Sequence, residues 1–292
     1  MQDGTRLIIF TDLDGTLIDY HTNSFADASQ ALSLIEDNSI PLIVCSSKTA
    51  AEIEYHRRRL ENHHPFISEN GGGLFVPKGY FPFDLADVVT AGGEAPITLE
   101  SDETYEIVRL GTRYAELRGV LEGLRRSGFP LRGFGDMSAV EVSALTGLPI
   151  EEAVLAKQRE FDEPFVVDGD ASEMAPIEKA IETSGFHCTT GRIKHLIGAN
   201  DKGKAVSLLL SMYRAGEKGI TTVAVGDAPN DVPMLRIVDY PVVVQQPDGS
   251  YHSDVDVEGL IKADGKGPLG WNRAITALLK RLAATGPKQS PL

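Results

Sequence analysis

The sequence predicts an α/β protein in which helices cover a parallel sheet, and two observations lead to this prediction. Short apolar runs alternate with amphipathic stretches, which is typical of strands that are buried on both faces. The alternation stops in the middle of the chain, where glycine breaks become more frequent, and then resumes. We therefore expect a Rossmann-like core made from both ends of the chain, with an α+β unit inserted between them.

The first part of the core contains three expected strands and two expected helices. The strands are short apolar runs at residues 7–10, 41–45 and 66–67. The first helix is expected at residues 27–37, where apolar residues recur at helical spacing. The second is expected at residues 49–60, which have a basic face.

The insert and the second part of the core complete the predicted organisation. In the insert we expect helices at residues 114–126 and 150–159 and a strand at 165–167. The alternation then returns, with helices at 202–213, 229–237 and 271–282 and strands at 222–225 and 242–244. The predicted domains are a core of residues 1–81 and 191–292 and an inserted domain of residues 82–190. We expect the last residues, from 285 onward, to be frayed.

The composition excludes several classes of protein. The chain has 292 residues and a formal net charge of −14, which argues against general binding to nucleic acid or to an anionic membrane surface. Two cysteines provide neither a disulfide framework nor the spacing of a zinc site. There is no leader pattern at the N-terminus and no apolar run near 20 residues. We expect a cytoplasmic, soluble protein.

Carboxylates follow the predicted strands at the edge where open α/β sheets place their sites. Asp12 and Asp14 come directly after the first strand, and Asp227 and Asp231 follow the strand at 222–225. Taken singly, each could simply cap a turn or a helix. Four carboxylates at one sheet edge would repel one another, and a hard divalent cation such as Mg²⁺ resolves that repulsion.

Two further positions suggest that the site binds a phosphate. Lys202 lies in the first turn of a predicted helix, where a cation opposes the helix dipole, so its place is explained by an anion nearby. The alternative is a solvated lysine. Ser46 or Ser47, after the second strand, could supply a hydroxyl and backbone N–H groups to phosphate oxygens, and the sequence does not separate these two serines.

These motifs resemble one known superfamily. DLDGT, a hydroxyl after the second strand, a lysine before a helix and GDxxND together are similar to the haloacid dehalogenase superfamily of phosphotransferases. The long insert resembles the large α+β cap, type C2, of that superfamily. Within it the chain resembles the mannosyl-3-phosphoglycerate phosphatase family, on the segments SSKTAAEI (46–53), ENGGGL (69–74), REFDE (159–163), GRIKH (191–195), GANDKG (198–203) and GPLGWN (267–272).

The resemblance implies a mechanism and a role for each motif residue. Asp12 would be the nucleophile that forms an aspartyl-phosphate, and Asp14 would be the general acid and then the base. Ser46 and Lys202 would hold the phosphoryl oxygens. The Mg²⁺ ion would be bound by oxygen groups, directly or through water, from Asp12, Asp14, Asp227, Asn230 and Asp231.

The resemblance also implies a small anionic substrate, mannosyl-3-phosphoglycerate, which is hydrolysed to the compatible solute mannosylglycerate. Its phosphate and carboxylate need cations, and the candidates are Lys48, Arg192 and His195. Arg159 is also a candidate, but its acidic neighbours make a surface ion pair equally plausible. Asn70 and Gly71 could contact the sugar or the glycerate, although glycine runs are also simply turns.

Three alternatives stay open from the sequence. The substrate could be glucosyl-3-phosphoglycerate or another sugar phosphate, with the same chemistry. A sugar phosphomutase on this fold would return the phosphate to the substrate instead of passing it to water. A sugar-phosphate sensor would normally lack one core residue, whereas Asp12, Asp14, Lys202 and Asp227 are all present.

Overall fold

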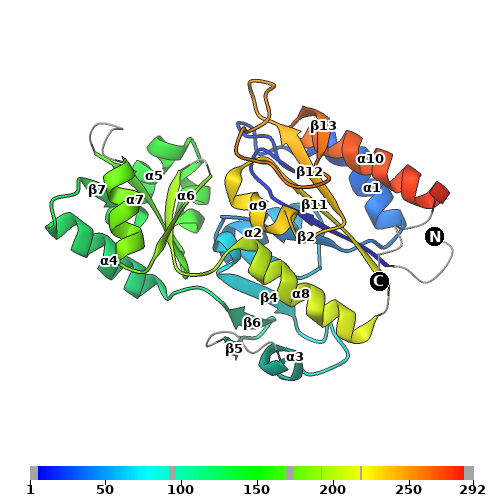
Figure 1. The fold of residues 1–292 in the computed structure, drawn as a ribbon, viewed down its shortest axis with the longest axis horizontal. Helices are drawn as coiled ribbons and strands as arrows, with labels where there is room; N and C mark the ends of the chain where they lie inside the picture. Colours follow the sequence, from blue (N-terminus) through cyan, green and yellow to red (C-terminus); the bar gives the residue numbers. More distant parts are fainter. Residues whose placement is uncertain (1–5, 92–96, 169–173, 192, 218, 286–292) are drawn as a thin grey trace.

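Two β-sheets form the framework of the protein (Figure 1). The computed structural model describes residues 6–91, 97–168, 174–191, 193–217 and 219–285. Nine described strands form the first sheet, in the order β13 (Ile261–Lys266), β12 (Tyr240–Gln245), β11 (Ile220–Gly226), β1 (Arg6–Thr11), β2 (Leu42–Cys45), β3 (Phe66–Ser68), β4 (Gly73–Pro77), β6 (Tyr105–Arg109) and β5 (Thr98–Ser101). From β13 to β3 the neighbours are parallel, and from β3 to β5 they are antiparallel.

Helices cover both faces of this sheet, and strand β1 shows why. Leu7 and Ile9 join one buried apolar cluster, while Ile8 and Phe10 join the other, as the period-2 alternation of a strand requires. The first cluster packs under η1 (Ala26–Ala28), α1 (Ser29–Asp37), α2 (Ala50–Arg59) and α10 (Gly267–Thr285), and the second under α3 (Leu85–Ala91), α8 (Lys202–Gly216) and α9 (Val232–Leu235). The predicted α/β class is confirmed.

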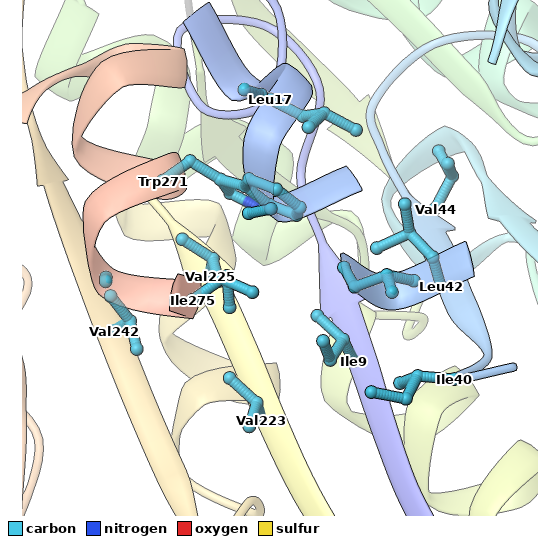
Figure 2. Close-up of a cluster of buried hydrophobic side chains, with 14 of the residues drawn as sticks. Ile9, Leu17, Ile40, Leu42, Val44, Val223, Val225, Val242, Trp271 and Ile275 are labelled. Atoms are coloured by element: carbon cyan, nitrogen blue, oxygen red, sulfur yellow. The ribbon is translucent and has the colours of Figure 1, made fainter. Parts of the chain in front are cut away.

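Trp271 fixes the last helix on the sheet. Its side chain is fully buried among strand residues such as Ile9 and Val225, as Figure 2 shows. The indole Nε1 donates a hydrogen bond of 3.1 Å to Thr11 Oγ1, and that hydroxyl donates one of 2.7 Å to the carbonyl of Asp12. The final helix therefore supports the end of β1, where the first carboxylate lies.

A second sheet belongs to the inserted part of the chain. Its strands are antiparallel, in the order β7 (Leu131–Gly133), β8 (Asp162–Val167), β10 (Lys194–Ile197) and β9 (His187–Thr190). One of its apolar clusters lies under α4 (Tyr114–Arg126) and α7 (Met174–Thr183), and the other under η3 (Phe134–Asp136), α5 (Ala139–Thr146) and α6 (Ile150–Ala156).

The two sheets divide the chain at different residues from those predicted. The prediction assigned residues 82–190 to the insert, but β5 and β6 extend the first sheet, and β10 belongs to the second. The sheet change therefore falls after residue 109 and after residue 197. Strand partners cannot be deduced from local apolar patterns, because a short strand has the same pattern whichever sheet it joins.

Most predicted elements are present, with changes at their ends. The helix expected at 150–159 ends at Ala156, and residues 157–161 connect it to β8. The helix expected at 229–237 is divided into η5 (Pro229–Asp231) and α9. Glycine-rich residues 69–73 form η2 (Glu69–Gly71) and the start of β4. In the described part of the chain, no helix has the length and apolar character needed to cross a membrane. The expectation of a frayed C-terminus concerns residues 285–292, which lie mostly outside the described residues.

Candidate active site

The parallel pairing of β1 and β11 brings two of the predicted carboxylates together. Thr11 lies opposite Val225 in the register, and the Asp12 N–H donates to the Val225 carbonyl over 3.0 Å. The next residues of both strands, Asp12 and Asp227, therefore emerge side by side at the carboxyl edge of the sheet. Both side chains are buried.

Glycine makes the close approach of the Asp227 carboxylate possible. Gly15 has a φ of +76° and turns the chain back directly after Asp14. A Cβ atom at Gly15 would lie 3.0 Å from Asp227 Oδ2 and 2.8 Å from the ring of Tyr20. The DGT part of the motif is thus explained by backbone geometry, and Thr16 adds a hydrogen bond of 3.1 Å from its hydroxyl to Asp227 Oδ1.

Lys202 is the cation at the centre of the cluster. Asp201 caps helix α8 by accepting from the Lys204 N–H, and the side chain of Lys202 turns inward and is fully buried. Its Nζ lies 2.7 Å from Asp12 Oδ1 and 2.6 Å from Asp231 Oδ1. The alternative of a solvated lysine is therefore wrong. Burial alone would lower the pKa of Lys202, but the two aspartates outweigh burial and hold this pKa above its ordinary value.

Burial and mutual repulsion act on the carboxylates. Burial raises the pKa of Asp12 to about 7, with Lys202 opposing the rise and Asp231 adding to it. Burial and then the charge of Asp12 also raise the pKa of Asp227 well above its ordinary value. Both groups would be stabilised in their ionised form by a cation placed between them.

The donor set fits such a cation. Asp12, Asp227 and Asp231 each have one oxygen within 4.8 Å of the others. Both oxygens of Asp231 are already used, by Lys202 and by the backbone N–H groups of Asp227 and Ala228. Asn230 Oδ1 is buried, and no donor in the described structure reaches it. The available groups are hard oxygens, the type that Mg²⁺ and Ca²⁺ prefer. Because both of its oxygens accept hydrogen bonds within the protein, Asp231 positions Lys202 and the backbone of Asp227 more than it offers ligand atoms.

A second ion pair joins Asp14 to the loop after β2. Lys48 Nζ lies 3.1 Å from Asp14 Oδ2 and 3.4 Å from Glu52 Oε1. Burial alone would lower the pKa of Lys48, but these carboxylates outweigh burial and hold this pKa above its ordinary value. The side chain of Asp14 is about one-third exposed and lies at the wall of the cavity described next.

Arg159 shows that a surface ion pair was the wrong alternative. Its side chain is 5% exposed and reaches from the insert to the core, where Nη1 donates to the Ser47 carbonyl over 2.8 Å and Nη2 lies 3.5 Å from Glu52. The insert is therefore held against the core beside Lys48.

One cavity lies between the core and the insert and collects most of the predicted residues. Core residues that line it include Asp12, Asp14, Ser47, Lys48, Asp227 and Asn230. The insert contributes Phe134, Arg159 and His195, among others. The arrangement thus brings carboxylates, cations and an aromatic ring to one cavity, which is typical of a site for a small polar ligand.

Some predicted residues are not in the lining of this cavity. Ser46 is fully buried, and its Oγ accepts from the Lys48 N–H over 3.2 Å. Both ends of the Asn70 amide are used inside the protein, by Asp162 and Asn230. A Cβ at Gly71 would lie 2.1 Å from the Asp201 carbonyl, so this glycine allows the loop to pack on the start of α8. Arg192 lies outside the described residues.

Comparison with known proteins identifies the family. The chain matches haloacid dehalogenase-like hydrolases over residues 9–78 and 165–251. It is 47% identical over 274 residues to a glucosyl-3-phosphoglycerate/mannosyl-3-phosphoglycerate phosphatase of Methanococcoides burtonii, an alignment that covers 93% of this chain and 97% of the relative. The chain belongs to the haloacid dehalogenase-like hydrolases.

Two further likenesses agree with this family. A glucosyl-3-phosphoglycerate/mannosyl-3-phosphoglycerate phosphatase of Persephonella marina is 39% identical over 280 residues, or 94% of this chain and 98% of the relative. The crystal structure of a Thermoplasma acidophilum protein has the same fold, with a TM-score of 0.63 at 17% identity over 94% of this chain and 99% of the other. The predicted family, fold class and enzyme class, a phosphoric monoester hydrolase, are confirmed.

Sequence reasoning missed several residues of the site. Gln246 donates to Asp227 Oδ2 over 2.8 Å, and its place soon after β12 could have identified it, because the other site residues also follow strands. Phe134 and Asp162 carry no such signal, since both lie in the insert and meet the core only through the tertiary fold.

Proposed function

We propose that this hydrolase removes the phosphate of mannosyl-3-phosphoglycerate and of glucosyl-3-phosphoglycerate, with Mg²⁺ as its cofactor. The observation that carries the proposal is the Asp12 carboxylate, which is fixed by Lys202 at the wall of the cavity between core and insert. The substrates follow from the names of the two relatives, which are similar to this chain over almost its whole length.

Asp12 would act as the nucleophile. Its Oδ1 is held by Lys202, so the other carboxylate oxygen is left to attack phosphorus and form an aspartyl-phosphate. The attack displaces the C3 alkoxide of the glycerate. Lys202 orients the carboxylate and partly neutralises the negative charge that gathers around the transferring group.

Asp14 would act as the general acid and then as the general base. Its carboxylate lies at the cavity wall and is fixed by Lys48, two residues beyond Asp12. In the first step the protonated form of this carboxyl group would give its proton to the leaving alkoxide. In the second step it would take a proton from the water that attacks the aspartyl-phosphate, which releases inorganic phosphate.

The Mg²⁺ ion would be held by the carboxylates of Asp12 and Asp227 and by the backbone carbonyl of Asp14. Asn230 would contribute its Oδ1, which has no hydrogen-bond donor in the described structure. When bound, the ion would neutralise the phosphate oxygens and keep Asp12 ionised. Asp231 would support the set through Lys202 and the backbone N–H of Asp227. Ser47, Lys48, Arg159 and His195 would face the phosphate and the glycosyl-glycerate part.

A substrate panel tests the proposal. The ratio kcat/KM is measured for both glycosyl-3-phosphoglycerates, 3-phosphoglycerate, mannose 6-phosphate and an aryl phosphate, each with Mg²⁺ and with a chelator. We expect the two glycosyl-3-phosphoglycerates to be preferred and all activity to disappear with the chelator. A preference for simple sugar phosphates would refute the substrate. Transfer of labelled phosphate to a second sugar, instead of to water, would indicate a mutase.

A further inference from the structure

A buried series of hydrogen bonds connects the insert with the segment after β11 that contains Asp227 and Asn230. Asp162, the first residue of β8, accepts from the Asn70 amide over 2.8 Å and contacts His195 Nδ1 at 2.7 Å. The other end of the Asn70 side chain, Oδ1, accepts from the amide of Asn230 over 3.0 Å. The series therefore runs from His195 through Asp162 and Asn70 to Asn230, three residues after Asp227.

The residues of this hydrogen-bond series are buried and held by the regular structure around them. Asp162 is fully buried, and Asn70 and His195 are 2% and 5% exposed. In the β8–β10 pairing Ile197 lies opposite Asp162, so His195 is its diagonal neighbour on the same face of the sheet. Asn70 has a φ of +55°, a left-handed conformation that asparagine tolerates better than most residues.

The backbone directly before Asp162 and the loop that carries Asn70 are held as well. The buried carboxylate of Glu69 accepts from the N–H groups of Glu160 and Phe161 over 2.8 to 3.1 Å, directly before β8. Asn200 donates to the carbonyls of Glu69 and Asn70. The position of Asp162 relative to the core is thus fixed by several independent contacts.

Asp162 also sets the direction of every hydrogen bond in the series. A carboxylate only accepts, so His195 must donate through Nδ1 and Asn70 must donate through its amide nitrogen. The Asn70 oxygen then accepts from Asn230, which leaves Asn230 Oδ1 as a free acceptor. At the other end, Nε2 is the nitrogen of His195 left for a ligand in the cavity that this residue lines.

We propose that Asp162 is the positioning residue of a sugar-recognition site, in which His195 Nε2 binds a hydroxyl group of the substrate's sugar. A hydroxyl both donates and accepts, so it can pair with Nε2 whether or not the imidazole is protonated. The inference rests on the proposed function only in assigning the hydroxyl to a glycosyl group. Fixed partners around a binding residue reduce the entropy that binding must overcome.

Two variants separate recognition from folding. In Asp162→Asn the amide competes with Asn70 and His195, so the imidazole loses its fixed orientation. In His195→Asn the shorter amide still reaches Asp162 from the place of Nδ1, but Nε2 is absent. The matched control is Asp168→Asn, in the same part of the insert but with a side chain 55% exposed. The melting temperature of each variant is recorded with its kinetics.

Each variant is assayed on two substrates with saturating Mg²⁺. One is the sugar phosphate with the highest kcat/KM in the panel, and the other is acetyl phosphate, which carries no sugar hydroxyl. We expect both variants to lose on the order of 10- to 100-fold in kcat/KM with the sugar substrate, mainly through KM. With acetyl phosphate, which offers no sugar hydroxyl, the loss should be clearly smaller than with the sugar substrate. The double variant should be no worse than His195→Asn, because Asp162 acts through the Nε2 contact that His195→Asn already removes.

The outcomes separate sugar recognition by His195 from a purely structural role of Asp162. A parallel loss on both substrates would show that Asp162 only supports the fold and would overturn the inference. Partial recovery in His195→Gln, whose amide reaches the place of Nε2, would support it. If another sugar phosphate is preferred in the panel, the proposed substrate fails but the inference is tested on that sugar. A preferred substrate without a sugar would overturn the inference itself.

Discussion

Replacement of Lys202 by methionine tests the electrostatic core of the site. Methionine has similar length and helix propensity, so the change removes the charge and little else. It leaves Asp12, Asp227 and Asp231 within 4.8 Å of one another and without the cation that contacts two of them. Turnover should be lost, but stability is the more direct measurement of the charge.

The magnitude follows from burial. Removing one partner of a buried ion pair costs on the order of 3–5 kcal/mol of unfolding free energy, because the remaining charge is uncompensated. Lys202 is fully buried. The matched control is Lys204→Met in the same helical turn, where the side chain is 61% exposed and an ion pair contributes at most about 1 kcal/mol.

The effect should depend on pH in a defined direction. The pKa of Asp12 rises from 3.8 to about 7 on burial, so the native state binds this proton more tightly, and stability without metal falls as pH rises toward 7. Lys202 opposes that rise, so its removal raises the pKa of Asp12 further. Asp12 therefore adds nothing below about pH 7 to the loss of unfolding free energy in Lys202→Met. Its contribution to this loss grows as the pH rises above about 7.

Urea denaturation in the presence of a chelator measures the difference. We expect the penalty of Lys202→Met to be larger at pH 8.5 than at pH 6 and to shrink when Mg²⁺ is added. A penalty equal to that of Lys204→Met at pH 8.5, or one that falls as pH rises, would refute the electrostatic reasoning.

Three other substitutions have definite expected results. Asp12→Asn should abolish turnover with an unchanged circular dichroism spectrum, and measurable turnover would exclude Asp12 as the nucleophile. Asp227→Ala should weaken Mg²⁺ binding in calorimetry at pH 8, whereas a titration like that of the exposed-site control Asp248→Ala would contradict a ligand role. Trp271→Phe should lower stability by about 1–3 kcal/mol, because the hydrogen bond to Thr11 and part of the ring packing are lost; a melting temperature equal to that of the wild type would show that this bond is unimportant.

Motion of the insert remains a separate expectation. A site that excludes water needs a cover that opens, and Arg159 and Glu69 hold the insert against the core in this structure. Small-angle X-ray scattering should show a more compact particle when a phosphate analogue and Mg²⁺ are added. Identical profiles with and without the analogue would argue against closure.

The sequence by itself determined the core of the fold and the chemistry of its edge. The alternation of Leu7, Ile8, Ile9 and Phe10 between two apolar clusters follows from the strand period, which depends only on local backbone geometry. The carboxylates after the strands could be predicted for the same reason, because parallel strands end at a common edge. Local patterns were sufficient wherever the relevant neighbours are set by the regular geometry of one element.

The tertiary structure alone decided which distant segments meet. No local pattern shows that β5 and β6 join the first sheet, or that Arg159 reaches the Ser47 carbonyl. Asp162 looks like any acid at the start of a strand, and it becomes the centre of a buried series of hydrogen bonds only because η2 and β10 pack on either side of it. Such contacts depend on the packing of whole elements, and the free energy of that packing is distributed over many residues instead of being written in one short motif.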